Sequence, residues 1–263
     1  MTWWAAQDTF ARLSRVNIPR AMSPFRLRKL LLALPVVWLG LSLGAPVARA
    51  ARPMLTDDAR VVDEKSCQVE SWVRRNQNST ERWALPACNF GYATEFTLGG
   101  SYLSGPTSSG NAELIAQAKH VFTPLTEGGW GRGFALGYAA HPGTFVPRRY
   151  LGDAYAYLLN SYASHNGRFV VHTNLGWSHD KAASAERLTW GIGTEVQQTG
   201  RLYWVAEVFG REQGRAWYQA GARLWLIPDR VQVDATIGNR FGSAGEDRWI
   251  SVGLRLLSPA FLP

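Results

Sequence analysis

Alternation of apolar and polar side chains is the feature that most constrains the fold of this chain. In the C-terminal third, apolar residues occupy every second position of 202–208, 231–237 and 250–256, and most of the even positions of 188–196. A period of two with one apolar face is typical of a β-strand. About twelve such segments follow one another, at 66–76, 81–89, 93–104, 111–123, 130–141, 153–164, 167–178, 186–198, 201–211, 215–227, 230–240 and 247–257. Several exceed the roughly 5–6 residues of a soluble strand and suit the roughly 9–11 that a strand needs to span a membrane.

The N-terminus has the anatomy of a secretory signal peptide. Arg26, Arg28 and Lys29 precede an apolar run over 30–43, and a small-x-small site follows at 48–50. This run is shorter than the roughly 20 apolar residues of a transmembrane helix, which is the alternative. We therefore predict cleavage near Ala50, with Met22 as an alternative start. The expected organisation is a leader over 1–50, an N-terminal segment over 51–65 and a barrel over 66–263.

Removal of the leader changes the charge balance. Residues 1–50 contain seven of the 28 Lys and Arg and one of the 20 Asp and Glu, so 21 basic and 19 acidic residues remain. The formal charge of +8 therefore reflects the targeting signal in large part. A nearly balanced mature chain argues against nucleic-acid binding, which calls for a concentrated basic patch.

An exported chain that crosses a membrane without helices must form a closed barrel. Beyond the leader, the sequence has no apolar run of about 18 residues, and backbone polar groups find no water in lipid. Short connections near 165–167, 198–200 and 227–230 alternate with longer ones at 103–111, 142–152, 179–185 and 241–246, as in bacterial barrels, although 123–129 is long for a short turn. Aromatic residues near strand ends suggest interfacial girdles: Trp130, Tyr150, Trp177, Trp190, Trp204, Trp217, Tyr218 and Trp249. We predict an all-β, transmembrane, antiparallel up-and-down β-barrel of about 12 strands; a soluble β-protein with a Trp-rich sugar-binding face is the alternative.

Cys67 and Cys88 test the first hairpin. Their midpoint lies inside the turn-like segment 76–80, so the two residues would stand opposite each other on paired strands. That placement brings their Cα atoms within the roughly 5.5 Å that a disulfide allows. We predict a disulfide near the periplasmic end of the hairpin, with two free thiols as the alternative.

The same alternation predicts which ionisable residues line the lumen. The inward set is Glu70, Arg74, Glu95, Lys119, His172, Glu195, Glu207, Arg223, Asp234 and Arg255. Its acids and bases nearly balance, and buried charges are least costly when they are paired. One interpretation is a partly plugged interior held by ion pairs, and the other is a narrow polar pore; the two are compatible.

Signals for catalysis are weak. None of the five histidines lies in a recognisable signature, and no Gly-x-Ser-x-Gly elbow is present. Gly191-Ile192-Gly193 lacks the helix of a nucleotide loop, so its glycines are interpreted as strand glycines that face the lumen or a neighbouring chain. We expect no enzyme activity, no cofactor and no metal site.

The beginning of the mature chain resembles a known family. The segments 52–59, 61–63, 67–72, 85–89 and 98–100 are similar to proteobacterial outer-membrane proteins of the MetA-pathway of phenol degradation family, over about 50 residues. The resemblance implies an outer-membrane barrel that passes small, aromatic or hydrophobic compounds, and it brings no catalytic residues. The chain departs from barrels in general at its end, where Phe261 is followed by Leu262 and Pro263 instead of being the terminal aromatic residue.

These observations favour a passive channel or uptake port for small molecules in the bacterial outer membrane. A structural or surface-binding barrel with a closed lumen, and an outer-membrane hydrolase, are the alternatives. The expected partners are outer-membrane lipid, lipopolysaccharide, the barrel-assembly machinery and small hydrophobic solutes. Arg148, Arg149, Arg211 and Arg215 suit the phosphates of lipopolysaccharide, although ordinary solvated loop charge is the preferred explanation.

Overall fold

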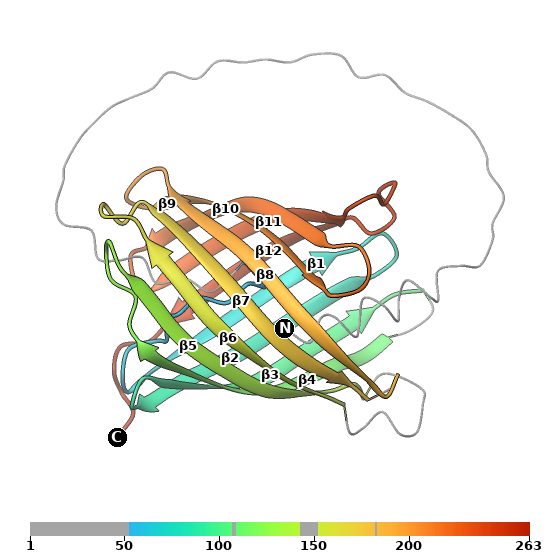
Figure 1. Cartoon of the computed structure of the whole chain (residues 1–263), viewed down its shortest axis with the longest axis horizontal. Coiled ribbons are helices and arrows are strands. Elements are labelled where there is room, and N and C mark those ends of the chain that lie inside the picture. The colour runs from blue at the N-terminus through green and yellow to red at the C-terminus, as the bar shows by residue number, and fades with distance from the viewer. Residues whose placement is uncertain (1–52, 107–108, 143–151, 182) are drawn as a thin grey trace, which may run out of the picture.

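Twelve antiparallel strands form a closed barrel. The computed structural model describes residues 53–106, 109–142, 152–181 and 183–263. Neighbouring strands are paired in sequence order, and β1 closes the barrel against β12, as Figure 1 shows. The strands are β1 Ser66–Arg75, β2 Thr80–Gly91, β3 Thr94–Ser104, β4 Ser109–Thr123, β5 Trp130–Ala140, β6 Asp153–Ala163, β7 Phe169–Asp180, β8 Ala185–Gln197, β9 Leu202–Arg211, β10 Trp217–Ile227, β11 Val231–Arg240 and β12 Trp249–Leu257. The described part of the chain contains no helix that is long and apolar enough to cross a membrane.

Both the fold class and the number of strands expected from the alternation are confirmed. Each strand begins and ends within about two residues of the expected bounds. Two connections are shorter than expected. The one expected at 103–111 is shortened because β3 ends at Ser104 and β4 begins at Ser109. The one expected at 179–185 is shortened because β7 extends to Asp180. The strands close into a ring, so the sheet has no free edge.

The two ends of the barrel differ. The turn end carries the connections 92–93, 124–129, 164–168, 198–201 and 228–230, together with the chain's C-terminus (Figure 1). The loop end carries 76–79, 105–108, 141–152, 181–184, 212–216 and 241–248. The unexpectedly long turn 124–129 has a packing reason, since Leu125 lies against Gly131 beside Ala59 of the segment that precedes β1.

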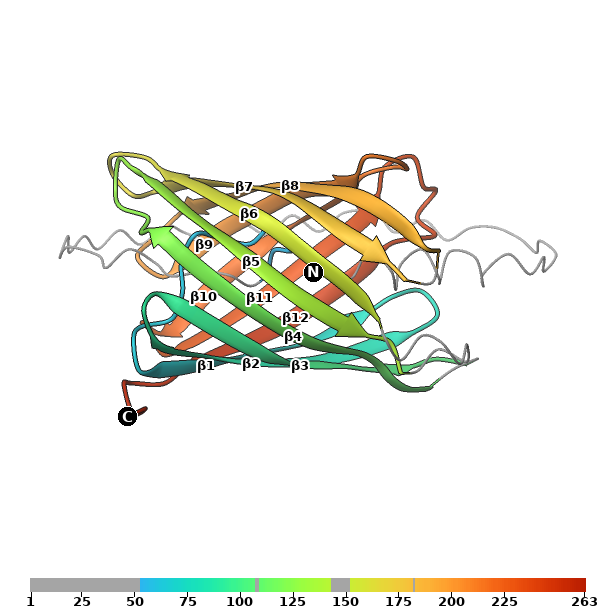
Figure 2. The same cartoon turned by 60° about the horizontal axis from the view of Figure 1, so that its bottom comes forward.

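The outer surface of the wall is apolar and its inner surface is polar. Leu98, Leu158 and Leu175 are 70%, 60% and 62% exposed on the outer face, whereas Glu95, His172 and Arg223 are buried. Such a wall suits a surrounding of lipid chains and is the reverse of a soluble domain. The strongly tilted strands of Figure 2 are the geometry that closes a sheet of this size.

Exposed aromatic side chains lie at both ends of the strands, as the sequence suggested. Tyr92, Trp130 and Trp204 are exposed at the turn end, and Tyr138 and Tyr218 at the loop end.

Two of the expected girdle residues are instead buried. Trp217 and Trp249 face the lumen and contact each other, with ring centroids 5.7 Å apart. Tyr150 lies outside the described residues.

The predicted disulfide is confirmed. Cys67 and Cys88 are direct partners in the β1–β2 register, with Cα atoms 4.0 Å apart, and they form the bond at the turn end.

Candidate functional site: the barrel lumen

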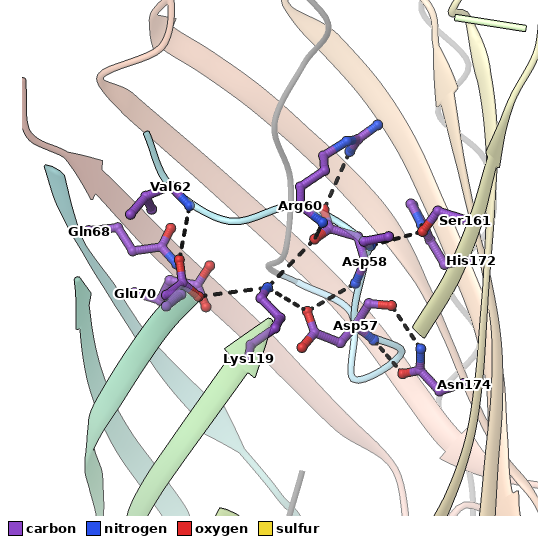
Figure 3. A network of polar contacts seen from close by, with 12 residues as sticks. Asp57, Asp58, Arg60, Val62, Gln68, Glu70, Lys119, Ser161, His172 and Asn174 are labelled. Carbon is purple, nitrogen blue, oxygen red and sulfur yellow. Dashed lines mark hydrogen bonds and ion pairs between the residues drawn. The ribbon is translucent and has the colours of Figure 1, made fainter. Parts of the chain in front are cut away.

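The segment before β1 fills the middle of the lumen. We call residues 53–65 the plug, and Figure 3 shows part of it running between the barrel walls. Thr56, Asp57, Asp58, Ala59 and Val62 of the plug are buried. The plug has neither helix nor strand, so its backbone polar groups need partners from elsewhere.

Side chains of the wall supply those partners. The backbone N–H groups of Leu55 and Thr56 donate to the two carboxylate oxygens of Glu207, each at 2.7 Å. Asn174 clamps Asp57 from both sides: its Oδ1 accepts from the Asp57 N–H at 2.7 Å, and its Nδ2 donates to the Asp57 carbonyl at 2.9 Å.

The remainder of the plug is held in the same way. The Ala59 N–H donates to Ser161 Oγ at 3.0 Å. Nearer the turn end, the Val62 N–H donates to Glu95 at 3.1 Å, and Asn89 Nδ2 donates to the Val62 carbonyl at 2.8 Å. At the other end, Gln219 Nε2 donates to the Pro53 carbonyl at 2.9 Å.

A lysine at the centre of the lumen collects the acidic groups of plug and wall. Lys119 Nζ lies 3.1 Å from Asp57, 3.8 Å from Asp58 and 3.7 Å from Glu95 (Figure 3). Tyr157 OH also donates to Asp57, at 2.9 Å. Buried charges that are paired and hydrogen-bonded avoid most of the cost of desolvation, so Lys119 joins plug and wall at a tolerable cost.

A second network surrounds Glu195. Its carboxylate lies 3.5 Å from Arg60 of the plug, 3.3 Å from Arg223 and 3.1 Å from His172 Nε2. His172 Nδ1 lies 2.8 Å from Ser161 Oγ. Because Ser161 accepts the Ala59 N–H, its hydroxyl is free to donate to Nδ1, which leaves the proton of a neutral His172 on Nε2, facing Glu195.

Two glycines make room for the plug. A Cβ at Gly191 would lie 2.6 Å from Thr56 Oγ1, and one at Gly193 would lie 2.9 Å from Met54 Sδ. Both glycines are on the inner face of β8, so the absence of their side chains lets the plug approach the wall. This decides between the two interpretations of Gly191-Ile192-Gly193: the glycines face the lumen.

Cavities remain between plug and wall. The larger measures about 110 Å³, room for several water molecules, and lies beside β1–β4, with Trp72, Leu85, Ile115 and Trp249 among its lining residues. A smaller one of about 40 Å³ lies between Leu55–Thr56 and β6–β9.

All ten residues of the expected inward set are buried inside the barrel. Glu95, Lys119, Glu195 and Glu207 contact the plug directly, and His172 reaches it through Ser161. Glu70 pairs with Arg255 at 3.5 Å, and Arg223 faces Asp234 in the β10–β11 register. Arg74 lies at the loop end, 4.4 Å from the Trp249 ring. Whether these residues line a path for solutes stays a prediction.

The four arginines that were expected in the loops do not share one location. Arg211 is the last residue of β9 and faces the lumen, whereas Arg215 is exposed in the 212–216 loop. Arg148 and Arg149 lie outside the described residues.

Comparison with known proteins places the fold among outer-membrane porins. The KdgM porin aligns with a TM-score of 0.53 at 9% identity, over 72% of this chain and 98% of the porin. The COG4313 outer membrane channel from Pseudomonas putida F1 aligns with a TM-score of 0.52 at 12% identity, over 76% and 98%. The NanC porin aligns with a TM-score of 0.53 at 8% identity, over 72% and 98%. No curated protein matches the chain.

A family model matches residues 39–257. The chain belongs to that family, described as uncharacterised conserved protein UCP029691. The porin-like barrel that the MetA-pathway resemblance implied is confirmed, while membership of the MetA-pathway family itself stays a prediction.

Sequence reasoning missed several uncharged residues that hold the plug. Ser161, Asn174, Gln219, Asn89 and Tyr157 all face the lumen from positions that the strand alternation marks as inward. The expected set was restricted to ionisable residues, although amides and hydroxyls are equally suited to a chain whose backbone needs partners. The strand alternation therefore contained the information needed to identify these residues.

Proposed function

We propose that this protein is an outer-membrane channel for small molecules, whose lumen is occupied by its own N-terminal segment in the state described here. One observation carries the proposal: the lumen is filled by a separate stretch of chain, not by the side chains of the wall. Gly191, Gly193, Ala135 and Ala139 leave space inside the wall, and the plug takes up part of that space. Displacement of the plug would therefore open a polar passage.

The alternative of a closed structural barrel makes a different use of the same contacts. It treats the plug as permanent filling, held by Glu207, Lys119 and Glu195. Water can replace hydrogen bonds and ion pairs at little net cost, whereas it replaces apolar packing poorly. The polar hold on the plug thus favours a segment that can leave.

The hydrolase alternative has one geometric observation behind it. Ser161, His172 and Glu195 form a hydrogen-bonded chain of the kind that activates a serine nucleophile. However, Ser161 and His172 are fully buried, and Ser161 Oγ is bound to the Ala59 N–H of the plug. The chain is better explained as an anchor for the plug. A lipid-hydrolysis assay with refolded wild-type protein and the Ser161→Ala variant tests this, and hydrolysis that depends on Ser161 would favour the enzyme.

Single-channel recording in planar bilayers tests the channel. Wild-type protein should give steps of ionic current, because cavities already separate the plug from β1–β4. A variant with weakened plug contacts, Asp57→Asn, should be open for longer, while Glu127→Asn in an exposed turn serves as the matched control. Absence of conductance above bare lipid in wild type and Asp57→Asn alike would leave the closed barrel as the better account.

We also propose an outer-membrane location, with the loop end outward and lipopolysaccharide as a contact. Arg75 and Arg82 support this, because both are exposed at the loop end on the strand face opposite to the inward residues. Guanidinium groups there would meet the phosphates of an outer leaflet. Membrane fractionation, combined with gel migration before and after boiling, tests the location. A soluble periplasmic protein without a heat-dependent shift would contradict it.

Assembly through the barrel-assembly machinery is a further part of this proposal. The tail after β12 is held beside the start of β1, since the Phe261 and Leu262 N–H groups donate to the carbonyl of Lys65, the last residue of the plug. Phe261 itself is exposed beside β1 at the turn end, where a partner could bind it. The solute is proposed to carry an apolar part, because Trp72, Leu85, Ile115 and Trp249 line the larger cavity.

A further inference from the structure

A ring of charged side chains surrounds the lumen at the loop end, and its two halves have opposite sign. Glu81 of β2, Glu113 of β4 and Asp153 of β6 are on one half. Arg187 of β8, Arg211 of β9 and Arg240 of β11 are on the other. All six lie on the inward face, within the five residues of their strands nearest the loop end. The strand register supports this placement, because register partners point to the same face of the sheet. Ser101 pairs with Glu113, Ser178 with Arg187, and Trp217 with Arg240.

The two halves oppose each other across the lumen. In the barrel order, β4 stands at the middle of the acidic half, and β10, between the arginine-bearing β9 and β11, stands six strands away in a ring of twelve. Opposite charges on facing walls create an electric field across the lumen, and the low-dielectric wall focuses that field. A molecule with separated positive and negative ends gains from both halves at once, whereas a plain ion gains from one half and is repelled by the other.

Glu113 is the most deeply buried carboxylate of the acidic half. Its side chain is 0% exposed, and within the described residues neither carboxylate oxygen has a hydrogen-bond partner. The hydroxyl of Ser101, its direct neighbour on β3, also has no partner among the described residues. Polar groups buried in this way are costly unless something else satisfies them, so this side of the ring favours an incoming positive charge.

Several charges of the ring have neighbouring groups. His141 lies 3.0 Å from Asp153, and Asp247 lies 2.7 Å from Arg240. Arg187 has an uncharged partner, Gln213, at 3.3 Å. Arg74 pairs in register with Glu81 where the two halves meet. Among the described residues, no group of three or more His, Cys, Asp or Glu is arranged to hold a metal ion.

We propose that the loop-end ring binds small zwitterions, with the solute's ammonium group toward Glu113 and Asp153 and its carboxylate toward Arg187 and Arg211. This rests on the proposed channel function and specifies its solute class. Arginine suits the carboxylate because its planar fork can make two parallel hydrogen bonds.

Equilibrium binding of three matched four-carbon probes tests the proposal. The probes are 4-aminobutyrate, butyrate and butylammonium, measured by saturation-transfer NMR at pH 8 on full-length protein folded in detergent. Taking about 1 kcal/mol for one ion pair with a solvated probe gives about fivefold in Kd, so 4-aminobutyrate, which can form one more pair than either single-charge probe, should bind about fivefold more tightly.

Two variants remove one charge from each half. Glu113→Gln breaks no hydrogen bond of the described structure and should weaken 4-aminobutyrate about fivefold without weakening butyrate. Arg187→Gln should weaken 4-aminobutyrate by a similar factor without weakening butylammonium. Glu127→Gln and Arg201→Gln, exposed at the turn end, are the matched controls and should change nothing. A heat-dependent gel shift verifies that each variant is folded.

The outcomes separate this inference from the channel itself. Equal affinity for the three probes, no binding of any probe, or equal effects of ring and control variants would each overturn the ring as a zwitterion site, whatever the conductance. Selective binding in a protein that shows no conductance would keep the site and remove the channel.

Discussion

Substitution of Gly191 by valine should open the lumen without unfolding the barrel. A Cβ at this position would lie 2.6 Å from Thr56 Oγ1 and 3.4 Å from Thr56 Cβ. Rotation of the threonine side chain could relieve the first contact, and the second is an ordinary van der Waals distance. We expect the two further methyl groups of valine, which extend beyond Cβ, to crowd Thr56 whatever its rotamer. The wall strand is held on both sides by β7 and β9, so the plug is the element that must move.

The magnitude follows from the cost of overpacking. Forcing extra methyl groups into a filled space costs about 1–3 kcal/mol, and that cost is borne only while the plug is in place. The ratio of unplugged to plugged barrels should therefore rise about 5- to 150-fold. Movement of Thr56 would also stretch the two 2.7 Å hydrogen bonds to Glu207, which adds to the effect.

Open probability in planar bilayers measures this ratio directly. Gly200→Val is the matched control, because a Cβ at Gly200 meets nothing within 4 Å. Heat-modifiability of both variants should equal that of wild type. An unchanged open probability in a folded Gly191→Val protein would refute the idea that close contact with β8 keeps the plug in place.

Three further predictions concern the wall, the disulfide and the anchor of the plug. Leu98→Arg places a charge on the lipid-facing side of β3 and should cost about 2–4 kcal/mol of folding free energy, so that the heat-modifiable form is lost. Tyr92→Arg at the turn end should be tolerated. Equal recovery of both variants would argue against lipid at this surface. The Cys67→Ser, Cys88→Ser double variant should lose about 3 kcal/mol from the roughly 20-residue loop it no longer closes. Its folded band should consequently disappear at a lower temperature in a graded gel assay, and an unchanged temperature would show that the β1–β2 pairing suffices. Glu207→Gln should weaken two charge-assisted hydrogen bonds by about 1–3 kcal/mol in total and raise the open probability in bilayers, and an unchanged value would remove Glu207 from the anchors.

The wall was predictable because its rules are local. In a strand, the face on which a side chain lies is fixed by counting in twos, so Leu98 and Glu95 fall on opposite faces whatever their neighbours are. The disulfide followed by the same counting across one hairpin, with Cys67 and Cys88 as register partners. The inward position of the ten ionisable residues required nothing more.

The plug was not predictable in the same way. Residues 53–65 show no period, and their partners are remote in sequence, with Thr56 and Glu207 separated by 151 positions. Trp217 and Trp249 were misplaced for a related reason: nearness to a strand end suggests a girdle, but parity alone decides which face a ring occupies. Both rings have the parity of the lumen.

The wall charges that touch the plug each keep another wall partner. Glu195 contacts Arg60 of the plug, yet Arg223 and His172 remain beside it from the wall. Lys119 keeps Glu95 when Asp57 and Asp58 leave, and Glu207 keeps Gln219. Breaking a buried pair is costly mainly because it strands a charge without compensation. Departure of the plug leaves each of these wall charges with a hydrogen-bond or ion-pair partner, and it carries Asp57, Asp58 and Arg60 toward water, which solvates them. The same contacts can therefore hold the plug firmly and still let it leave.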